Sequence, residues 1–291
     1  MTARVVLAHD APGPTLVLRH DQLPPGALAL GSELTHLRRA LAATPYPHLN
    51  KIALYQPTGP RHLDYRFVQG LLTPTGFDFR TGCGHSLLAC VVAEGGAPHP
   101  GGVTVRAVTT GDTVRCYEGG ADGTYTLEFQ RAPDAPGTLP TGRPVDLLDG
   151  VPVTLVRYGN PYVLVDARHL PPTGQKQALL ALRARAARML GYAPHSLLPK
   201  IAAFRETADG GIAARALTVG GWHPRLALTG ATAFAAAGAI DGTVVRGPVT
   251  RIGTPGGPVR VSVTATTVRV HDKRAYVLAR LELPWRIHAK A

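Results

Sequence analysis

The turn around Cys83 concentrates the residue types best suited to chemistry. Cys83 lies in Thr81-Gly82-Cys83-Gly84-His85-Ser86, directly before an apolar run of helical length. A cysteine at a helix N-terminus lies at the positive end of the helix dipole, which favours the thiolate form, and the free amides there can bind a carboxylate. The alternative is a small buried residue in a tight turn, but the flanking glycines favour a functional role. We predict that Cys83 is catalytic and that Gly84, His85 and Ser86 contact the substrate.

Lys51 is the second candidate catalytic residue. It opens an apolar strand pattern, where a lysine can act as an acid or base or can bind a carboxylate. Lys200 has the same local context, so one of the two lysines can be merely structural. Asn160, in Gly159-Asn160-Pro161 between two strand patterns, either presents its amide to a ligand or serves only the turn.

Weaker candidates surround these residues. His85 could be a base, and His223 and Arg225 precede a second apolar helix and could hold an anion. Cys90 is expected in the core, and Cys116 receives no role. The sequence contains no Gly-rich phosphate loop, no HExxH motif and no metal-ligand cluster, so we expect neither a metal nor a cofactor.

The chain repeats itself once, which tells how these residues are positioned. Leu23-Pro24-Pro25, Lys51-Ile52-Ala53 and Thr81-Gly82 return as Leu170-Pro171-Pro172, Lys200-Ile201-Ala202 and Thr229-Gly230, at offsets of 147, 149 and 148 residues. The shared offset predicts two similar domains, residues 1–146 and 150–274. A ligand site is expected between them, because domain interfaces favour concave pockets.

Composition limits the class of protein. The 291 residues are 45% hydrophobic and carry a net charge of +12, with only three cysteines. The arginines that supply most of this charge are scattered, so we predict no nucleic-acid partner. The odd cysteine count argues against a disulfide framework, and neither a membrane span nor a signal-peptide pattern is recognisable. We therefore expect a cytoplasmic protein, either a monomer or a homodimer.

The hydrophobic pattern predicts an α+β fold. Strands are expected at residues 5–7, 15–19, 51–55, 65–71, 103–108, 113–117, 125–130, 153–157, 162–166, 200–204, 244–252, 259–270 and 275–283. Helices are expected at residues 33–43, 84–93, 175–190 and 231–239. The helices at 84–93 and 231–239 are apolar on every face, as burial requires. Each domain should therefore be a curved mixed or antiparallel sheet wrapped around one central apolar helix.

Together these motifs resemble the diaminopimelate epimerase-like superfamily, and within it the PrpF family of 2-methylaconitate cis-trans isomerases. The matching segments are Lys51-Ile52-Ala53-Leu54, Cys83-Gly84-His85-Ser86, Leu139-Pro140-Thr141-Gly142, Gly159-Asn160-Pro161, Pro199-Lys200-Ile201-Ala202, Thr229-Gly230 and Ile240-Asp241-Gly242-Thr243-Val244. The resemblance implies that Lys51 and Cys83 are the catalytic pair and that Asn160 meets the substrate. It also implies that the last strand, at about residues 275–285, returns to the first domain.

The resemblance implies a cofactor-independent isomerase that moves a double bond, by an allylic proton shift or by cis-trans isomerisation, in a small unsaturated carboxylic or dicarboxylic acid. Developing negative charge would rest on amides at the two central helices, including those of Thr229, Gly230 and Ala231. No thiol mirrors Cys83 there, which disfavours racemisation by two cysteines.

Two turns depart from the family pattern, at residues 9–15 and 254–257, where substrate carboxylates are expected to bind. This change makes a substrate from specialised metabolism plausible, such as a 4-substituted pyrroline carboxylate on the way to the 4-alkylproline units of lincosamide-type antibiotics. A non-catalytic ligand-binding protein with the same cleft is the alternative from another functional class.

Overall fold

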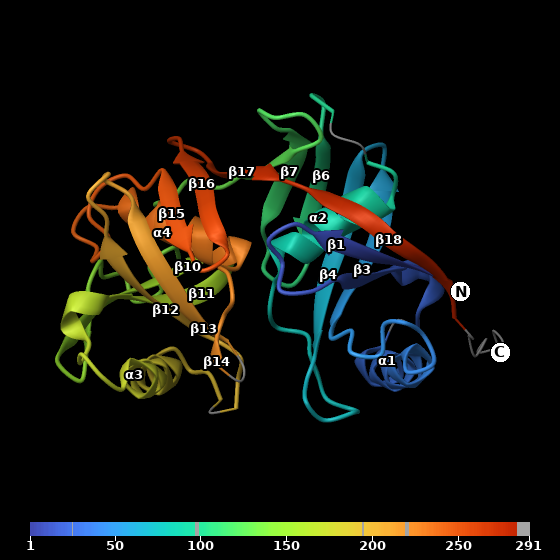
Figure 1. Cartoon of the computed structure of the whole chain (residues 1–291), viewed down its shortest axis with the longest axis horizontal. Helices are drawn as coiled ribbons and strands as arrows, with labels where there is room; N and C mark the ends of the chain where they lie inside the picture. Colours follow the sequence, from blue (N-terminus) through green and yellow to red (C-terminus); the bar gives the residue numbers. More distant parts are fainter. Residues whose placement is uncertain (25, 97–98, 194, 219–220, 284–291) are drawn as a thin grey trace.

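The molecule consists of two lobes that lie side by side, each a curved sheet around one helix (Figure 1). The computed structural model describes residues 1–24, 26–96, 99–193, 195–218 and 221–283. The predicted α+β class is confirmed, and the described part of the chain has no helix long and apolar enough to cross a membrane.

The elements follow one another in the same order in both halves. The first half contains β1 (Thr2–Ala8), β2 (Thr15–Arg19), η1 (His20–Gln22), α1 (Ala27–Leu41), β3 (Lys51–Gly59), β4 (His62–Gly70), β5 (Phe77–Asp78), α2 (Gly84–Ala93), β6 (Val103–Ala107), β7 (Thr113–Glu118) and β8 (Tyr125–Phe129). After β9 (Asp146–Leu148), the second half contains β10 (Val151–Tyr158), β11 (Asn160–Asp166), η2 (Ala167–His169), α3 (Gln175–Met189), β12 (Lys200–Glu206), β13 (Ile212–Thr218), β14 (Gly221–Trp222), α4 (Leu228–Gly238), β15 (Arg251–Thr254), β16 (Gly257–Val263), β17 (Val268–Lys273) and β18 (Ala275–Glu282).

Strand pairing repeats as well. In the first half, β1–β2 and β3–β4 are antiparallel, whereas β2–β3 and β4–β6 are parallel. In the second half, β10–β11 and β12–β13 are antiparallel, whereas β11–β12 and β13–β15 are parallel. Lys51 and Lys200 are the first residues of the equivalent strands β3 and β12. From this correspondence we propose that the chain is built from two copies of one unit.

The last strands connect the halves. β18 pairs antiparallel with β1 along its whole length, from Thr2 opposite Glu282 to Ala8 opposite Ala275. β17 pairs antiparallel with β8, so the chain already contacts the first half from Val268 onward. These pairings hold the lobes together and set the position of the cleft between them.

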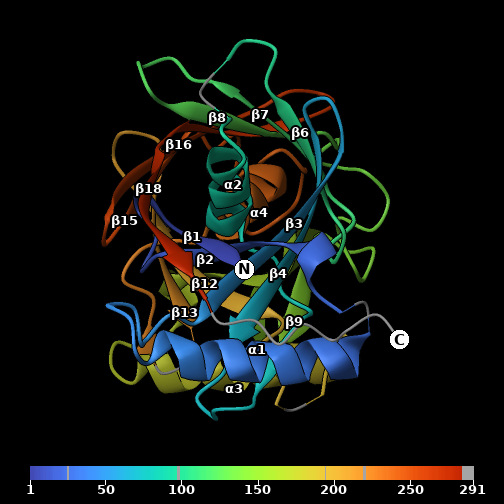
Figure 2. The same ribbon diagram turned by 90° about the vertical axis from the view of Figure 1, so that its right-hand side faces the viewer.

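The two central helices are enclosed by protein on all sides. Nine of the ten residues of α2 and all eleven residues of α4 are buried. Figure 2 shows them in the middle of the surrounding strands, with α1 and α3 outside. α1 buries Leu30, Leu34, Leu37 and Leu41 in a core shared with β1, β2 and β3. The outer helices therefore need only one apolar stripe, whereas α2 and α4 need apolar residues on every face.

Some predicted boundaries are wrong. α1 begins at Ala27 and α4 at Leu228, each earlier than expected. The strand predicted at residues 244–252 begins only at Arg251, because the chain before it is a loop in which Val245 and Val249 pack into the core while residues 246–248 are exposed. Gly247 in that loop has φ +71°, which a strand does not allow.

The strand predicted at residues 259–270 is two strands, β16 and β17. A turn separates them in which the Thr264 hydroxyl accepts hydrogen bonds from the amides of Thr266 and Thr267. Threonine hydroxyls compete with strand pairing in this way, and the alternating pattern alone did not reveal it.

Candidate functional site

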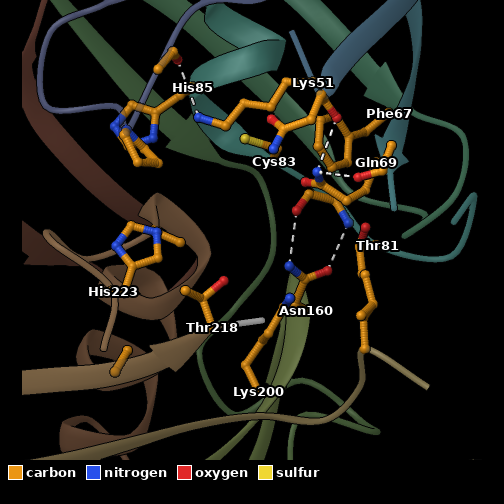
Figure 3. Close-up of a pocket in the computed structure, with 18 of the residues that line it drawn as sticks. Lys51, Phe67, Gln69, Thr81, Cys83, His85, Asn160, Lys200, Thr218 and His223 are labelled. Atoms are coloured by element: carbon orange, nitrogen blue, oxygen red, sulfur yellow. Dashed lines mark hydrogen bonds between the residues drawn. The ribbon is translucent and has the colours of Figure 1, made fainter. Parts of the chain in front are cut away.

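A cavity of about 300 Å³ lies between the two halves. The first half contributes Pro12, Gly13, Asn50, Lys51, Phe67, Gln69, Gly70, Leu71, Leu72, Thr81, Gly82, Cys83 and His85 to its wall. The second half contributes Asn160, Tyr162, Leu197, Lys200, Ala216, Leu217, Thr218, His223, Pro224 and Ala227. Figure 3 shows the labelled side chains of this wall converging from the two halves. The wall contains lysine and histidine but no aspartate or glutamate among the described residues, so the cavity favours an anion.

Cys83 is the N-cap residue of α2 and has extended backbone geometry there. Its thiol is free and partly accessible, whereas Cys90 and Cys116 are buried. Burial raises the pKa of the thiols of Cys90 and Cys116, so both stay protonated and inert. The Tyr65 hydroxyl donates a hydrogen bond of 2.9 Å to the Cys83 carbonyl, which helps to hold the turn.

The Asn160 side chain, from the second half, holds this turn by hydrogen bonds. Its Oδ1 accepts a 2.7 Å hydrogen bond from the Gly82 amide, and its Nδ2 donates to the Gly82 carbonyl at 2.8 Å (Figure 3). Nδ2 also lies 3.3 Å from Thr229 Oγ1, at the start of α4. Because both ends of the amide are used on protein groups, Asn160 positions Cys83 by holding the preceding residue.

Lys51 points into the same cavity from the start of β3. Its Nζ donates a 3.2 Å hydrogen bond to the Gly13 carbonyl, and the residue is only 8% exposed. Burial lowers the pKa of Lys51, and the nearby Cys83 opposes this shift. A buried lysine that gives up its proton more readily than usual is suited to proton transfer.

Lys200 lines the cavity from the second half, and sequence reasoning left it without a role. Burial, followed by the positive charge of Arg183, lowers the pKa of Lys200 to about 8. The repeat was the signal that could have found it, since Lys200 is the counterpart of Lys51. Whether both lysines reach one cavity depends on how the halves dock.

Two polar atoms in the wall lack a protein partner. His85 Nε2 and Thr81 Oγ1 are buried, and neither makes a hydrogen bond with the described residues. Burial, followed by the positive charges of Lys51 and Lys273, lowers the pKa of His85 well below its usual value, so its ring is neutral. Buried polar atoms normally have partners, so these two atoms are suited to receive a ligand.

Two turns that depart from the family pattern meet beside the cavity. Arg225 Nη1 donates to Asp10 Oδ1 at 2.7 Å and to the Gly256 carbonyl at 2.8 Å. Lys273 Nζ lies 3.3 Å from Asp10 Oδ2. Arg225, predicted as an anion site, is therefore paired with a carboxylate of the protein, whereas His223 lines the cavity.

Known proteins with similar sequences and structures carry isomerase, tautomerase and epimerase names. "Putative isomerase YbhH" of Escherichia coli is 30% identical over 250 aligned residues, which cover 71% of each chain. The 4-oxalomesaconate tautomerase of Pseudomonas putida is 27% identical over 226 residues, covering 64% of this chain and 63% of its own. No protein-family model matches the chain.

Solved structures show the same fold. Methylitaconate-delta-isomerase aligns with a TM-score of 0.64 and 21% identity over 97% of this chain and 95% of its own. A hydroxyproline epimerase from Agrobacterium vitis aligns with a TM-score of 0.58 and 14% identity over 96% and 92%. The chain belongs to the PrpF family. The superfamily fold expected from the motifs is confirmed, and the protein is an isomerase.

The residues predicted to bind substrate in this PrpF-family isomerase fall into two groups. His85 and Asn160 line the cavity with Cys83 and Lys51. Gly84, Ser86, Thr229, Gly230 and Ala231 are buried behind the wall. Ser86 lies 3.0 Å from the hydroxyl of Thr15. The substrate roles of both groups stay predictions, and those of the second group rest on backbone amides at the two helix N-termini.

Proposed function

We propose that this isomerase moves a double bond within a small unsaturated carboxylic acid by an allylic proton shift that needs no cofactor. One observation carries the proposal: Lys51 and Cys83, the two predicted acid–base residues, line one cavity whose described wall holds no acidic side chain. Its volume, about 300 Å³, suits a metabolite-sized acid.

The proposed reaction is a proton relay between the two residues. One of the pair takes a proton from the allylic carbon, and the electrons of that C–H bond enter a dienolate. The other residue donates its proton to a different carbon of the system, so the double bond moves and the composition is unchanged. No electron is lost or gained, which is why acid–base groups alone suffice.

Enolate charge would rest on groups at the start of α2. The free amides of that helix and its dipole favour an anion in the position where Cys83 begins the helix. The neutral His85 ring offers a further polar contact. We infer that the substrate carboxylate and the reacting carbons lie between α2 and the strand that carries Lys51.

The relatives support acids of low molecular mass as substrates. Their names specify methylitaconate in one case and 4-oxalomesaconate in another. We therefore propose an unsaturated acid with two or three carboxylates as the preferred class. A 4-substituted pyrroline carboxylate, expected from the altered turns at residues 9–15 and 254–257, is the competing candidate.

The test is proton exchange in deuterated water, followed by NMR on a panel of acids. The panel holds methylitaconate, 2-methylaconitate, 4-oxalomesaconate and a 4-substituted pyrroline carboxylate. We expect deuterium at the allylic carbon and a shifted double bond with at least one acid, unchanged after dialysis against a chelator. Binding of these acids without exchange or isomerisation contradicts the proposal.

A further inference from the structure

Lys200 is the one cavity lysine whose ammonium group has no protein partner in the described structure. Lys51, the other lysine of the described wall, donates a hydrogen bond to the Gly13 carbonyl. No described residue forms an ion pair or hydrogen bond with Lys200, although it lies in the wall of the cavity.

The surroundings of Lys200 do not neutralise its charge. Arg183 is held nearby, since its Nε donates at 2.8 Å to the carbonyl of Pro199, the residue before Lys200. Asp78 acts on the charge of Lys200 without pairing with it, and its Oδ1 accepts hydrogen bonds from the amides of Arg80 and Thr81. Two cations therefore lie together beside a cavity, where an anion would stabilise both.

Other unpartnered groups lie around the same space. Thr81 Oγ1 and His85 Nε2 are buried without protein partners on the opposite half of the wall. Cys83 lies between them in the sequence and interacts electrostatically with Lys200. A ligand that contacts both these atoms and Lys200 spans the cavity from one half to the other. Such a ligand lies next to Cys83.

We propose that Lys200 binds a carboxylate of the substrate from the second half and so holds the reacting carbons against Lys51 and Cys83. This inference rests on the proposed function, and it gives the second half of the repeat a substrate-binding role. In this proposal Lys200 favours substrates that carry a carboxylate, while Lys51 remains in the proton relay.

The test measures binding separately from turnover. Calorimetric titration with succinate, a saturated acid that cannot isomerise, is compared between the wild type, Lys200→Met and Lys176→Met. Lys176 lies on the outer helix α3, does not line the cavity, and serves as the matched control. We expect Lys200→Met to weaken succinate binding by about 10–100-fold, as for loss of one charged hydrogen bond, and Lys176→Met to leave it unchanged. Succinamide, which lacks the charges, should bind the wild type far more weakly.

Melting and kinetic measurements separate this binding role of Lys200 from a merely structural one. Because burial opposes the charge of Lys200, Lys200→Met should melt at the same temperature as the wild type or higher. With the isomerised acid, KM should rise by a similar factor while kcat changes less, and Lys200→Arg should restore part of the affinity.

Succinate that binds Lys200→Met as tightly as the wild type, or that fails to bind the wild type, overturns the proposal. Loss of kcat with unchanged succinate affinity overturns it as well, in favour of an acid–base role. Failure of the proposed function is distinguishable, because no acid of the panel would then isomerise whatever the result with succinate.

Discussion

At the residue scale, the candidate site combines one partly exposed cysteine with two lysines that come from opposite halves of the cavity wall. Lys51 and Lys200 begin equivalent strands in the two halves, and both interact electrostatically with Cys83. The buried Cys90 and Cys116 show that a cysteine in this fold is otherwise a core residue. What distinguishes Cys83 is its position at the N-terminus of α2 beside the cavity.

Replacing Cys83 by alanine should lower kcat by about 10²–10⁴-fold, the usual contribution of a general acid or base. The fold should persist, because the side chain is only partly buried. Turnover is measured by NMR in deuterated water with the accepted acid. Cys90→Ala is the matched control and should retain turnover at a small packing cost. Undiminished exchange in Cys83→Ala would remove the thiol from the relay.

The affinity for succinate should depend on pH through Lys200. Its pKa is lowered to about 8, so the ammonium that binds a carboxylate is present below that pH and lost as pH rises through it. Arg183, Asp78, Cys83 and His223 are the charged or titratable groups that interact with it. The ratio of succinate dissociation constants between Lys200→Met and the wild type should be large at pH 7 and approach one above about pH 9. A ratio independent of pH would contradict this assignment.

The same shift has a consequence for stability. The pKa of Lys200 is lower in the folded protein than its ordinary value of 10.5. The unfolded chain therefore binds more protons between about pH 8 and 10.5, and the contribution of Lys200 to stability rises with pH across that window. Thermal melting of the wild type and Lys200→Met should converge as pH increases from 8 to 10. If the melting temperatures of the two proteins differ by the same amount at every pH, burial of the Lys200 charge does not destabilise the folded protein.

At the element scale, the close contact between α2 and α4 places both helix N-termini at one cleft. Gly84 opens α2 directly against Leu228, the first residue of α4. A Cβ at Gly84 would lie 2.8 Å from Leu228 Cβ, which is closer than side chains can approach. The absence of a side chain at Gly84 is therefore what allows the two helices to meet.

Gly84→Ala should destabilise the protein by about 1–3 kcal/mol, because it overpacks this contact. It should also lower turnover, since it displaces the start of the helix that carries Cys83. Gly31 in α1 is the matched control, because a Cβ there meets nothing within 4 Å. Gly31→Ala should stabilise by about 0.5–1 kcal/mol through helix propensity. Denaturant unfolding of both variants gives the comparison, and equal stability of the two would refute the packing argument.

At the scale of the whole molecule, the turn that carries Cys83 in one half is held by an amide side chain from the other. Asn160 and Gly82 are 78 residues apart in the sequence, yet they share two hydrogen bonds. Asp112 adds to this junction as a buried carboxylate beside the Gly159 backbone, and burial raises its pKa. Strand pairings of β18 with β1 and of β17 with β8 keep the halves in this arrangement.

Asn160→Ala should cost about 1–3 kcal/mol of stability, because the Gly82 amide and carbonyl lose their partner. Turnover should fall far more than this loss of stability alone explains. Thr232→Val is the control, since Thr232 makes buried hydrogen bonds within the second half only. It should lose stability but keep activity. Melting curves and kcat of both variants decide, and equal activity of the two would show that the hydrogen bonds of Asn160 do not serve catalysis.

Local pattern determined much of this molecule. The boundaries of α2 follow from an apolar run that starts after a glycine-flanked cysteine and ends at Gly95-Gly96, and the family was recognisable from short motifs around Lys51 and Cys83. Local rules failed at residues 244–252, where the buried Val245 and Val249 lie in a loop and imitate the apolar pattern of a strand. Both the correct helix and the wrong strand were predicted from the spacing of apolar side chains. That spacing indicates which residues are buried more directly than it indicates the backbone conformation.

Only the tertiary structure decided how the halves share the site. The sequence left open whether Lys200 serves function, and it predicted a substrate contact for Asn160 without showing which protein groups hold its side chain. Docking of the lobes brings Lys200 into the cavity and directs both ends of the Asn160 amide to Gly82. Such contacts join residues far apart in the chain. Their geometry depends on the packing of the two sheets and helices against each other, which no local spacing records.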